Sequence, residues 1–398
     1  MIKAFKYRLY PNRQQVQAFE QMLETHRRLY NDALAERKSA WEDEQRSVTA
    51  YDQSAQLKDS RKTDECLAAT NFSSCQTTLR RLDKSFQNFF RRVKQGQKPG
   101  YPRFKSRDRF DSVLYIHYGD GCKFDGHSRV YFQHVGKVKV KLHRPIEGTI
   151  KTLSFKREVD KWYAIFTCEL PDVEKKPVET TVGIDMGLKS FLVTSDGEVI
   201  DPPHYYRDAQ AKLRRLNRAV SRKKKGSNRR KKAIKQLAKF HQHIANQRKD
   251  FHHKTARTLV TDYDLISHED LNIKGLAKTR LAKSIHDVGW GQFLGILTSK
   301  AEEAGVWVVA VPAKNTTQMC SRCQQLPTVK KTLKDRVHRC EHCGYETDRD
   351  LNAAENILRL GRSLQAITCA DEGRAQPENN RIHAGHLTTT PISRILNT

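Results

Sequence analysis

The order of apolar and polar residues predicts a strand, a helical segment and then more strands in the first 172 residues. Residues 2–10 alternate apolar and mostly basic side chains and end at Pro11, which is typical of a strand with one buried face. From about residue 13 to 95 apolar residues recur at helical spacing, and a Gly- and Pro-rich break follows. Later alternating runs predict strands at 112–117, 128–132, 137–142, 150–155 and 162–170. The simplest arrangement is a small β-barrel interrupted by a helical insertion.

Beyond an expected linker at 171–177, the pattern predicts a second domain that mixes strands and helices. The run Val306–Val311 is apolar throughout, which is typical of a central strand buried on both faces. Beyond Gly361 the chain is polar and weakly patterned, so we expect a poorly ordered tail. Further strands are expected at 180–185, 190–194, 198–201 and 264–267, and helices at 207–224, 228–263, 289–304 and 351–360. This order of elements is that of an RNase H-like nuclease core.

The composition is that of a soluble globular protein with room for two or three domains. The chain has 398 residues, of which 37% are hydrophobic and 30% are charged. No apolar stretch approaches the roughly 18 residues of a membrane span, and the basic amino terminus is not a secretory signal. We therefore expect a cytoplasmic protein without a membrane partner, in which cysteines that show no pairing pattern persist as free thiols.

A large positive charge points to a polyanionic partner. Lys and Arg number 73 against 45 Asp and Glu, which gives a formal net charge of +28. This excess would repel itself in a compact fold unless a polyanion neutralises it, and nucleic acid is the usual one. A basic membrane-surface protein is the alternative, but no amphipathic basic helix with a strongly apolar face stands out.

Two segments concentrate this charge. Residues 221–232 contain eight cations, and basic helices flank them, which favours a face that tracks phosphates over a solvated loop or a localisation signal. Residues 91–109 are also basic and carry Tyr101 and Phe104, which suit base stacking and, equally, a core. Two such surfaces would hold two nucleic acids at once. The candidate contacts in these segments are Arg103, Lys105, Arg222, Lys223, Lys224, Lys225, Arg229 and Arg230.

Four cysteines near the carboxyl end form two pairs of equal spacing. Cys320 and Cys323 are separated by two residues, as are Cys340 and Cys343, and 16 residues lie between the pairs. Each pair forms a tight turn that presents two thiolates to one ion, so the four residues are the ligand set of a structural zinc ribbon. Disulfides or unrelated cysteines are the alternative, against which the doubled spacing and the turn residue Gly344 argue.

Three carboxylates fall where an RNase H-like core holds its metal ions, at the ends of central strands and on the closing helix. Asp185 interrupts an apolar strand, Glu269 follows a predicted strand, and Asp350 stands near the start of the last helix. A buried carboxylate is costly without a cation. Such cores hold two divalent ions roughly 3.5–4 Å apart, which activate water and stabilise the leaving 3′ oxygen. All-oxygen ligands indicate Mg²⁺, for which Mn²⁺ could substitute.

Each of these residues also has a purely structural explanation. Asp185 could be a turn residue, Glu269 has acidic neighbours, and Asp348 or Asp350 could cap the helix. Their order along the chain, with the expected elements between them, favours the catalytic interpretation.

In combination, these motifs resemble those of the TnpB proteins of bacterial and archaeal insertion sequences, compact relatives of the type V CRISPR effector nucleases. The resemblance extends to about residue 360. The segments that carry it are Tyr7–Pro11, Tyr30–Leu34, Gly100–Lys105, Gly183–Gly187, Ser221–Ser227, Gln247–Lys254, Ser284–Phe293, the zinc ribbon and Asp348–Ala354.

The resemblance implies a multidomain α+β protein. Its expected parts are a wedge-like β-barrel at 1–12 and 106–172, an inserted helical recognition unit at 13–105, a RuvC (RNase H-like α/β) nuclease domain at 178–314 and 347–362, the inserted zinc ribbon at 315–346, and a disordered tail at 363–398.

The resemblance also implies an activity, RNA-guided cleavage of double-stranded DNA. A structured guide RNA from the transposon end would supply sequence specificity by base pairing, while protein reads a short target-adjacent motif. Carried over by motif, the RuvC acids are Asp185, Glu269 and Asp350, and Tyr51 and Gln76 belong to the motif-reading surface. The expected particle is a monomer in a ribonucleoprotein, cytoplasmic in a prokaryote and associated with the nucleoid when bound to DNA.

One departure and two rival functions remain open at this point. Cys323 is followed by Gln324, where Gly is more usual, which leaves the shape of the first turn undecided. A nuclease-inactive RNA-guided DNA-binding regulator would have lost carboxylates, and the three acids argue against it. A transposase-type recombinase would need a joining nucleophile or a self-sufficient end-binding domain, and we find neither in the sequence.

Overall fold

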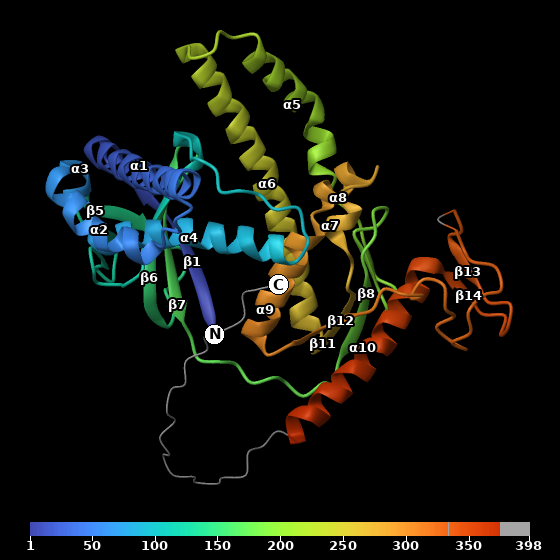
Figure 1. The fold of residues 1–398 in the computed structure, drawn as a ribbon. Coiled ribbons are helices and arrows are strands. Elements are labelled where there is room, and N and C mark those ends of the chain that lie inside the picture. The colour runs from blue at the N-terminus through green and yellow to red at the C-terminus, as the bar shows by residue number, and fades with distance from the viewer. Residues whose placement is uncertain (333, 375–398) are drawn as a thin grey trace, which may run out of the picture. The chain divides into compact units, whose positions relative to one another are not determined.

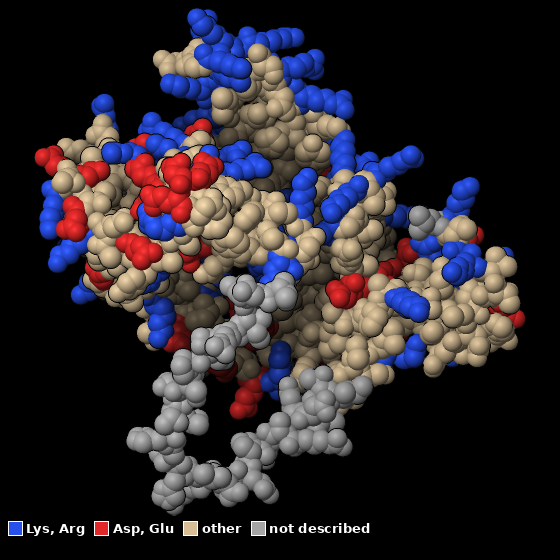
Figure 2. Space-filling view, viewed as in Figure 1, with Lys and Arg blue, Asp and Glu red and all other residues tan. Residues whose placement is uncertain are grey.

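The computed structural model describes residues 1–332 and 334–374, which form two compact units (Figure 1). The first unit consists of Met1–Val173 with Leu216–Phe240, and the second of Glu174–Arg215 with the chain from His241 onward. Lys and Arg side chains are spread widely over the visible face, in keeping with the net charge of +28 (Figure 2). Among the helices of the described residues, none combines the length and apolar character that crossing a membrane requires.

A seven-stranded antiparallel sheet organises the first unit, in the order β2-β6-β7-β1-β5-β4-β3. The amino-terminal strand β1 lies in the middle, between β7 and β5. Phe5, Tyr7 and Leu9 of this strand are buried, and the basic side chains between them point to the opposite face. The strands are β1 Ile2–Tyr10, β2 Ser112–Tyr115, β3 Cys122–Phe124, β4 Arg129–Phe132, β5 Gly136–Lys141, β6 Thr149–Glu158 and β7 Lys161–Glu169. The predicted strands are confirmed, except that β3 was not foreseen.

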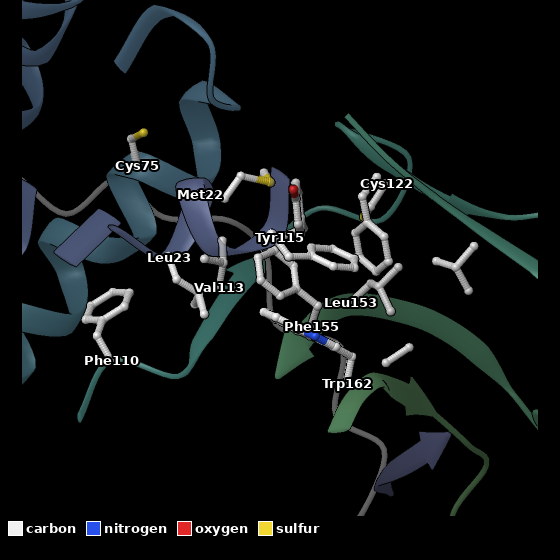
Figure 3. Packing of buried hydrophobic residues seen from close by; sticks show 14 of the residues in the cluster. Met22, Leu23, Cys75, Phe110, Val113, Tyr115, Cys122, Leu153, Phe155 and Trp162 are labelled. Atoms are coloured by element: carbon white, nitrogen blue, oxygen red, sulfur yellow. The ribbon is translucent and has the colours of Figure 1, made fainter. Parts of the chain in front are cut away.

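The sheet curls around an aromatic core that it shares with α1 (Arg13–Glu44) and α4 (Phe72–Lys94) (Figure 3). The ring of Phe19, on α1, has its centroid 4.5 Å from that of Phe155 and 4.9 Å from that of Trp162. Aromatic pairs at such separations add to the free energy gained by burying their surface. The inserted helices and the sheet therefore share one core, and closure of the sheet into a barrel stays a prediction.

The helical insertion follows β1, as its apolar spacing predicts. Helix α1 begins with a capping box in which the Gln15 N–H donates to the Asn12 side chain and the Asn12 N–H donates to Gln15. Between α1 and α4 lie α2 (Ala50–Thr63) and the short α3 (Glu65–Ala68). Buried His26 of α1 fixes this helix on α4, because its Nε2 lies 2.9 Å from the Ser74 hydroxyl.

A five-stranded mixed sheet organises the second unit, in the order β10-β9-β8-β11-β12. Strands β8, β11 and β12 are parallel, and β9 and β10 continue from β8 as an antiparallel meander. The strands are β8 Thr181–Asp185, β9 Leu192–Thr194, β10 Val199–Ile200, β11 Leu265–Glu269 and β12 Trp307–Val311. Every residue of β11 is buried.

The prediction that Val306–Val311 forms the central strand is wrong. Strand β12 lies at the edge of the sheet and only its last residue is buried, whereas β11 occupies the central position. The segment before β8 covers this edge, since the Lys176 N–H donates to the Gly305 carbonyl and the Trp307 indole N–H donates to the Lys176 carbonyl. An apolar run alone cannot distinguish a covered edge strand from a central one.

The closing helix α10 (Arg349–Arg374) packs along β8 and β11 (Figure 1). Two glycines permit this close approach. An added Cβ on Gly183 of β8 would overlap the backbone of α10 at Ala354, and one on Gly361 of α10 would overlap Ser267 of β11. The helix is thereby held against the two strands that end in candidate carboxylates.

The helices between β10 and β12 are α5 Tyr205–Ser221, α6 Asn228–Asp262, α7 Ile273–Leu276, α8 Ala282–Val288 and α9 Trp290–Ala304. Helices α5, α6 and α9 confirm the prediction, and the short α7 and α8 were missed. The prediction that the last helix ends at 360 is wrong, because Gly361 lies inside the helix as a packing contact instead of ending it. Helix α10 therefore occupies the start of the expected tail, whose residues 375–398 lie outside the described residues.

Candidate metal centres and nucleic-acid surfaces

The four predicted zinc ligands lie together. Their Sγ atoms are all within 4.8 Å of one another, with 3.7 Å from Cys320 to Cys343 and 3.5 Å from Cys323 to Cys340. A disulfide would need about 2.05 Å, whereas four thiolates about 2.3 Å from one tetrahedral zinc ion stand roughly 3.8 Å apart. The thiols are free, and the cluster fits a zinc ion and not a pair of disulfides.

The two cysteine turns have the same shape although one lacks glycine. The Gln324 N–H donates to the Cys320 carbonyl at 2.9 Å, and the Gly344 N–H donates to the Cys340 carbonyl at 3.0 Å. Gln324 adopts a φ of 63° and Gly344 a φ of 71°, both in the left-handed region. The turn that the sequence left undecided is therefore formed, at a cost of roughly 1 kcal/mol for a non-glycine residue. The antiparallel pair β13 (Val337–Arg339) and β14 (Glu346–Asp348) completes the ribbon.

Asp185 and Glu269 end two neighbouring parallel strands. The register pairs Ile184 of β8 with His268 of β11, so the next residue of each strand brings a carboxylate to the same edge of the sheet. Asp350 stands in the first turn of α10, the helix that packs along both strands. The fold therefore brings Asp185 and Glu269 to the same end of the sheet and places Asp350 on the helix that packs along their strands.

The electrostatic environment of Asp185 includes the other two acids. The pKa of Asp185 is raised to about 8, first by burial and then by the negative charges of Glu269 and Asp350, while Arg349 opposes the shift. Burial also raises the pKa of Glu269, against the effect of a hydrogen bond from the Thr316 hydroxyl. Carboxylates that resist ionisation next to one another are the donor set expected of a divalent-cation site, because the cation removes the repulsion.

Two acidic neighbours of the candidate carboxylates have structural roles of their own. Asp348 caps α10, since its Oδ1 accepts the N–H of Asp350 at 2.8 Å and that of Leu351 at 3.3 Å. Asp264, an acidic neighbour of β11, accepts hydrogen bonds from the Thr180 N–H and hydroxyl. Asp350 forms an ion pair of 3.5 Å with Arg349.

Sequence reasoning missed the residues that support this site. Thr316 is buried between β12 and the ribbon, and it donates to Glu269. Asn356 of α10 donates to the Thr316 carbonyl at 3.0 Å and to the Met319 carbonyl at 2.8 Å, and Asn352 also donates to Met319. Both asparagines are fully buried. The sequence signal that could have indicated them is the spacing of these asparagines, four positions apart on one helix face. Buried amides need hydrogen-bond partners.

The basic segment 221–232 comprises the last residue of α5, the turn that follows and the first residues of α6. Figure 2 shows Lys and Arg side chains gathered over the end of these two helices. Lys223 donates to the Ala219 carbonyl, and Arg230 donates to the Lys223 carbonyl, so two of the predicted contacts form hydrogen bonds within the hairpin of α5 and α6. The exposed ones are Arg222, Lys224, Lys225 and Arg229. Their exposure suits phosphate contacts, which stay a prediction.

The other predicted contacts lie in the amino-terminal part of the first unit, before residue 174. The Asn31 side chain forms two hydrogen bonds with the backbone of Lys105. It accepts the Lys105 N–H at 2.8 Å and donates to the Lys105 carbonyl at 3.0 Å. Arg103 is exposed nearby in sequence. Tyr51, in the first turn of α2, is 83% exposed, while Gln76 on α4 is half-buried. The role of these four side chains in binding stays a prediction.

Three family profiles match separate parts of the chain. The one described as "Probable transposase" matches residues 165–280, which include Asp185 and Glu269. "Cas12f1-like, TNB domain" matches residues 290–357, which include the four cysteines and Asp350. "Helix-turn-helix domain" matches residues 1–46, which here form strand β1 and helix α1.

Fold and sites define a mixed α/β protein that combines a curled sheet, a second sheet in which two parallel strands end in Asp185 and Glu269, and a four-cysteine cluster. A Streptomyces pristinaespiralis protein named "Putative RNA-guided DNA endonuclease" is 34% identical, over 95% of this chain and 94% of the relative. An Escherichia coli K12 protein, "Putative RNA-guided DNA endonuclease InsQ", is 30% identical over 92% and 94%. The chain belongs to the TnpB family of insertion sequences.

A solved structure supports the fold at the level of architecture. The structure titled "Structure of the mini-RNA-guided endonuclease CRISPR-Cas_phi3" aligns with a TM-score of 0.50, over 91% of this chain and 92% of that one. Sequence identity is 8%, so this likeness concerns the fold alone.

Proposed function

We propose that this chain is the RNA-guided DNA endonuclease of a transposable element, and that it cleaves double-stranded DNA beside a short target-adjacent motif by divalent-metal-assisted hydrolysis. The observation that carries the proposal is the arrival of Asp185 and Glu269 at the ends of paired parallel strands, with Asp350 close enough to raise the pKa of Asp185. The names of two relatives aligned over nearly their full length support the activity.

The nuclease domain would be RuvC-like. The sheet order β10-β9-β8-β11-β12, with three parallel strands and an antiparallel meander, supports an RNase H-like assignment. The proposed domains are the RuvC-like core at 178–314 and 347–362, the zinc ribbon at 315–346, the wedge-like barrel at 1–12 and 106–172, and the recognition insertion at 13–105.

In the proposed reaction, Asp185, Glu269 and Asp350 would hold Mg²⁺, or Mn²⁺ in its place. When bound, the metal activates water and stabilises the leaving 3′ oxygen. The three carboxylates must lose their protons to act as ligands, and Arg349 assists by lowering the pKa of Asp185. The hydroxyl of Thr316 keeps the Oε1 atom of Glu269 in one orientation. Ordering the ligands in advance lowers the cost of assembling the site.

The cationic surfaces would bind the guide RNA and the target DNA through their phosphates. Such contacts provide affinity without sequence information, which base pairing with the guide supplies instead. Tyr51 and Gln76 would read the target-adjacent motif, for which the exposure of Tyr51 is suitable. The particle would be a monomeric protein with one structured RNA from the transposon end, in the prokaryotic cytoplasm and at the nucleoid when bound to DNA.

The test is purification of the full chain together with the RNA encoded at the end of its element, followed by a plasmid cleavage assay with Mg²⁺. We expect a bound structured RNA and sequence-directed cutting that Asp185→Ala abolishes. Glu302→Ala, at an exposed acidic residue on α9, serves as the matched control and should cut normally.

Other outcomes would identify the rival functions. RNA-loaded protein that binds its target without cutting it at any Mg²⁺ or Mn²⁺ concentration would make the chain a DNA-binding regulator. RNA-free protein that cuts or joins element ends would make it a recombinase.

A further inference from the structure

The end of α4 and the segment after it carry a cluster of aromatic rings, which we call the aromatic patch: Phe86, Phe89, Phe90 and Tyr101. Tyr101 lies edge-on to Phe86 and to Phe89, with ring centroids 5.6 Å and 5.4 Å apart. Phe90 is stacked on Phe86 at 6.3 Å and lies edge-on to Phe89 at 5.2 Å. The four rings therefore form one continuous apolar surface.

Much of this surface faces outward. Phe90 is 60% exposed and Tyr101 is 45% exposed, whereas Phe86 packs against the hydrophobic core of the first unit. A single exposed ring is ordinary, but clustered exposed rings on one side of a helix usually mark a binding surface. The patch is thus anchored on one side and open on the other.

The chain segment that carries the patch is cationic. Residues 84–107 contain eight Lys and Arg side chains and neither Asp nor Glu. In the described part of the chain, Arg91, Arg92 and Lys94 form no ion pair, and all three are exposed. Cations in the last turn of α4 also stabilise that helix end. Helix stabilisation does not explain the further cations at Lys98 and Arg103, which lie beyond the helix.

The patch is also held in a fixed arrangement. Arg37 of α1 places its guanidinium 5.2 Å from the centre of the Phe86 ring, and it forms an ion pair with Asp83. Asn31 secures the backbone of the segment after Tyr101 through its two hydrogen bonds to Lys105. The rings would therefore lose little conformational entropy when a ligand stacks on them.

We propose that the aromatic patch stacks unpaired bases of the guide RNA while the surrounding cations contact its phosphates. Flat rings surrounded by Arg and Lys suit a single-stranded nucleotide, because the rings can stack on its base while the cations contact its phosphate. The guide is favoured over DNA because an exposed aromatic cluster is a liability unless a permanent partner covers it, and the guide is the partner that stays bound. This inference rests on the proposed function only for the identity of the RNA.

The first experiment measures binding of the full chain to a single-stranded oligouridine of about 12 nucleotides and to an abasic strand of equal length. Replacing both exposed rings, with Phe90→Leu and Tyr101→Leu, should weaken oligouridine binding roughly 5- to 100-fold and leave abasic binding unchanged. Phe90→Trp should keep the affinity, because it retains a stacking surface. Tyr131→Leu, at a ring of β4 that is 40% exposed and outside the patch, is the matched control.

Equal losses with both strands would show that the substitutions act through charge or folding, and no loss would show that the rings do not bind bases. Either result overturns the proposal.

The second experiment probes base reactivity in the co-purified RNA, where the double variant should expose a small set of unpaired bases. If only target DNA binding suffers, the occupant is DNA and the proposal is wrong. None of these measurements uses DNA cleavage, so failure of the nuclease assignment is detected separately by Asp185→Ala.

Discussion

Gly183 of β8 lies directly against the backbone of Ala354 in α10, with no space for a side chain between them. A Cβ added to Gly183 would overlap the Ala354 carbonyl oxygen and would lie 2.6 Å from the amide nitrogen of Leu358. Backbone atoms inside a helix cannot move aside as the end of a flexible side chain can. This contact therefore sets the distance between the strand that ends at Asp185 and the helix that begins beside Asp350.

The first prediction follows from this contact. Gly183→Ala should lower the free energy of unfolding of the second unit by about 1–3 kcal/mol or more, because the helix must shift to relieve the overlap. Chemical denaturation followed by circular dichroism measures the change. Gly295→Ala is the matched control, since Gly295 lies in α9 with open space around it and alanine favours a helix. An unchanged stability of Gly183→Ala would mean that the strand and the helix are not packed as described.

The second prediction concerns Thr316, which orients Glu269. Thr316→Val keeps the shape of the side chain but removes the hydroxyl, so a buried carboxylate loses its hydrogen bond. We expect cleavage to fall roughly 10- to 100-fold and the Mg²⁺ concentration for half-maximal rate to rise. Thr316→Ser should restore both. If Thr316→Val lowers stability but leaves the metal dependence of cleavage unchanged, the residue is only structural.

The third prediction concerns zinc. Cys340→Ser should reduce bound zinc from about one ion per chain to a small fraction, since structural sites use all four ligands. Elemental analysis of the purified protein measures the metal, and hydrogen exchange should show lost protection from 318 to 344 while β8 and β11 stay protected. Cys66→Ser, at a cysteine outside the cluster, should leave the zinc content unchanged. Full zinc content in Cys340→Ser would exclude the four-thiolate site.

The fourth prediction concerns acid sensitivity. Burial lowers the pKa of His26 from 6.5 to about 4 in the folded protein. Between pH 6.5 and about 4, the unfolded chain therefore binds a proton at this histidine and the folded chain does not. The free energy of unfolding that is present above pH 6.5 is lost as the pH falls toward 4. The loss amounts to about 3 kcal/mol, at roughly 1.4 kcal/mol for each pH unit.

Urea denaturation of the wild type and of His26→Gln across this pH range measures the effect. The variant should show a shallower decline, because glutamine does not titrate. His252, whose pKa is also lowered to about 4, titrates in both proteins and cancels from the comparison. Parallel curves for the two proteins would show that His26 is accessible to protons in the fold.

Much of this protein could be predicted from residues that lie close together in the sequence. The alternation over β1 predicts its buried face, the spacing of Cys320, Cys323, Cys340 and Cys343 predicts the thiolate cluster, and apolar periodicity predicts most helices. Local patterns succeed here because strand alternation, helical periodicity and cysteine turns involve residues only a few positions apart.

The tertiary structure decided what depends on distant contacts. It made β11 the central strand instead of β12, placed Gly361 inside α10, and gave Glu269 a hydroxyl donor from Thr316, 47 positions away. The charge of +28 and most of the order of strands and helices could be predicted from the sequence alone. Which side chains meet was not, because burial and electrostatic coupling arise only when the sheet and its closing helix pack together.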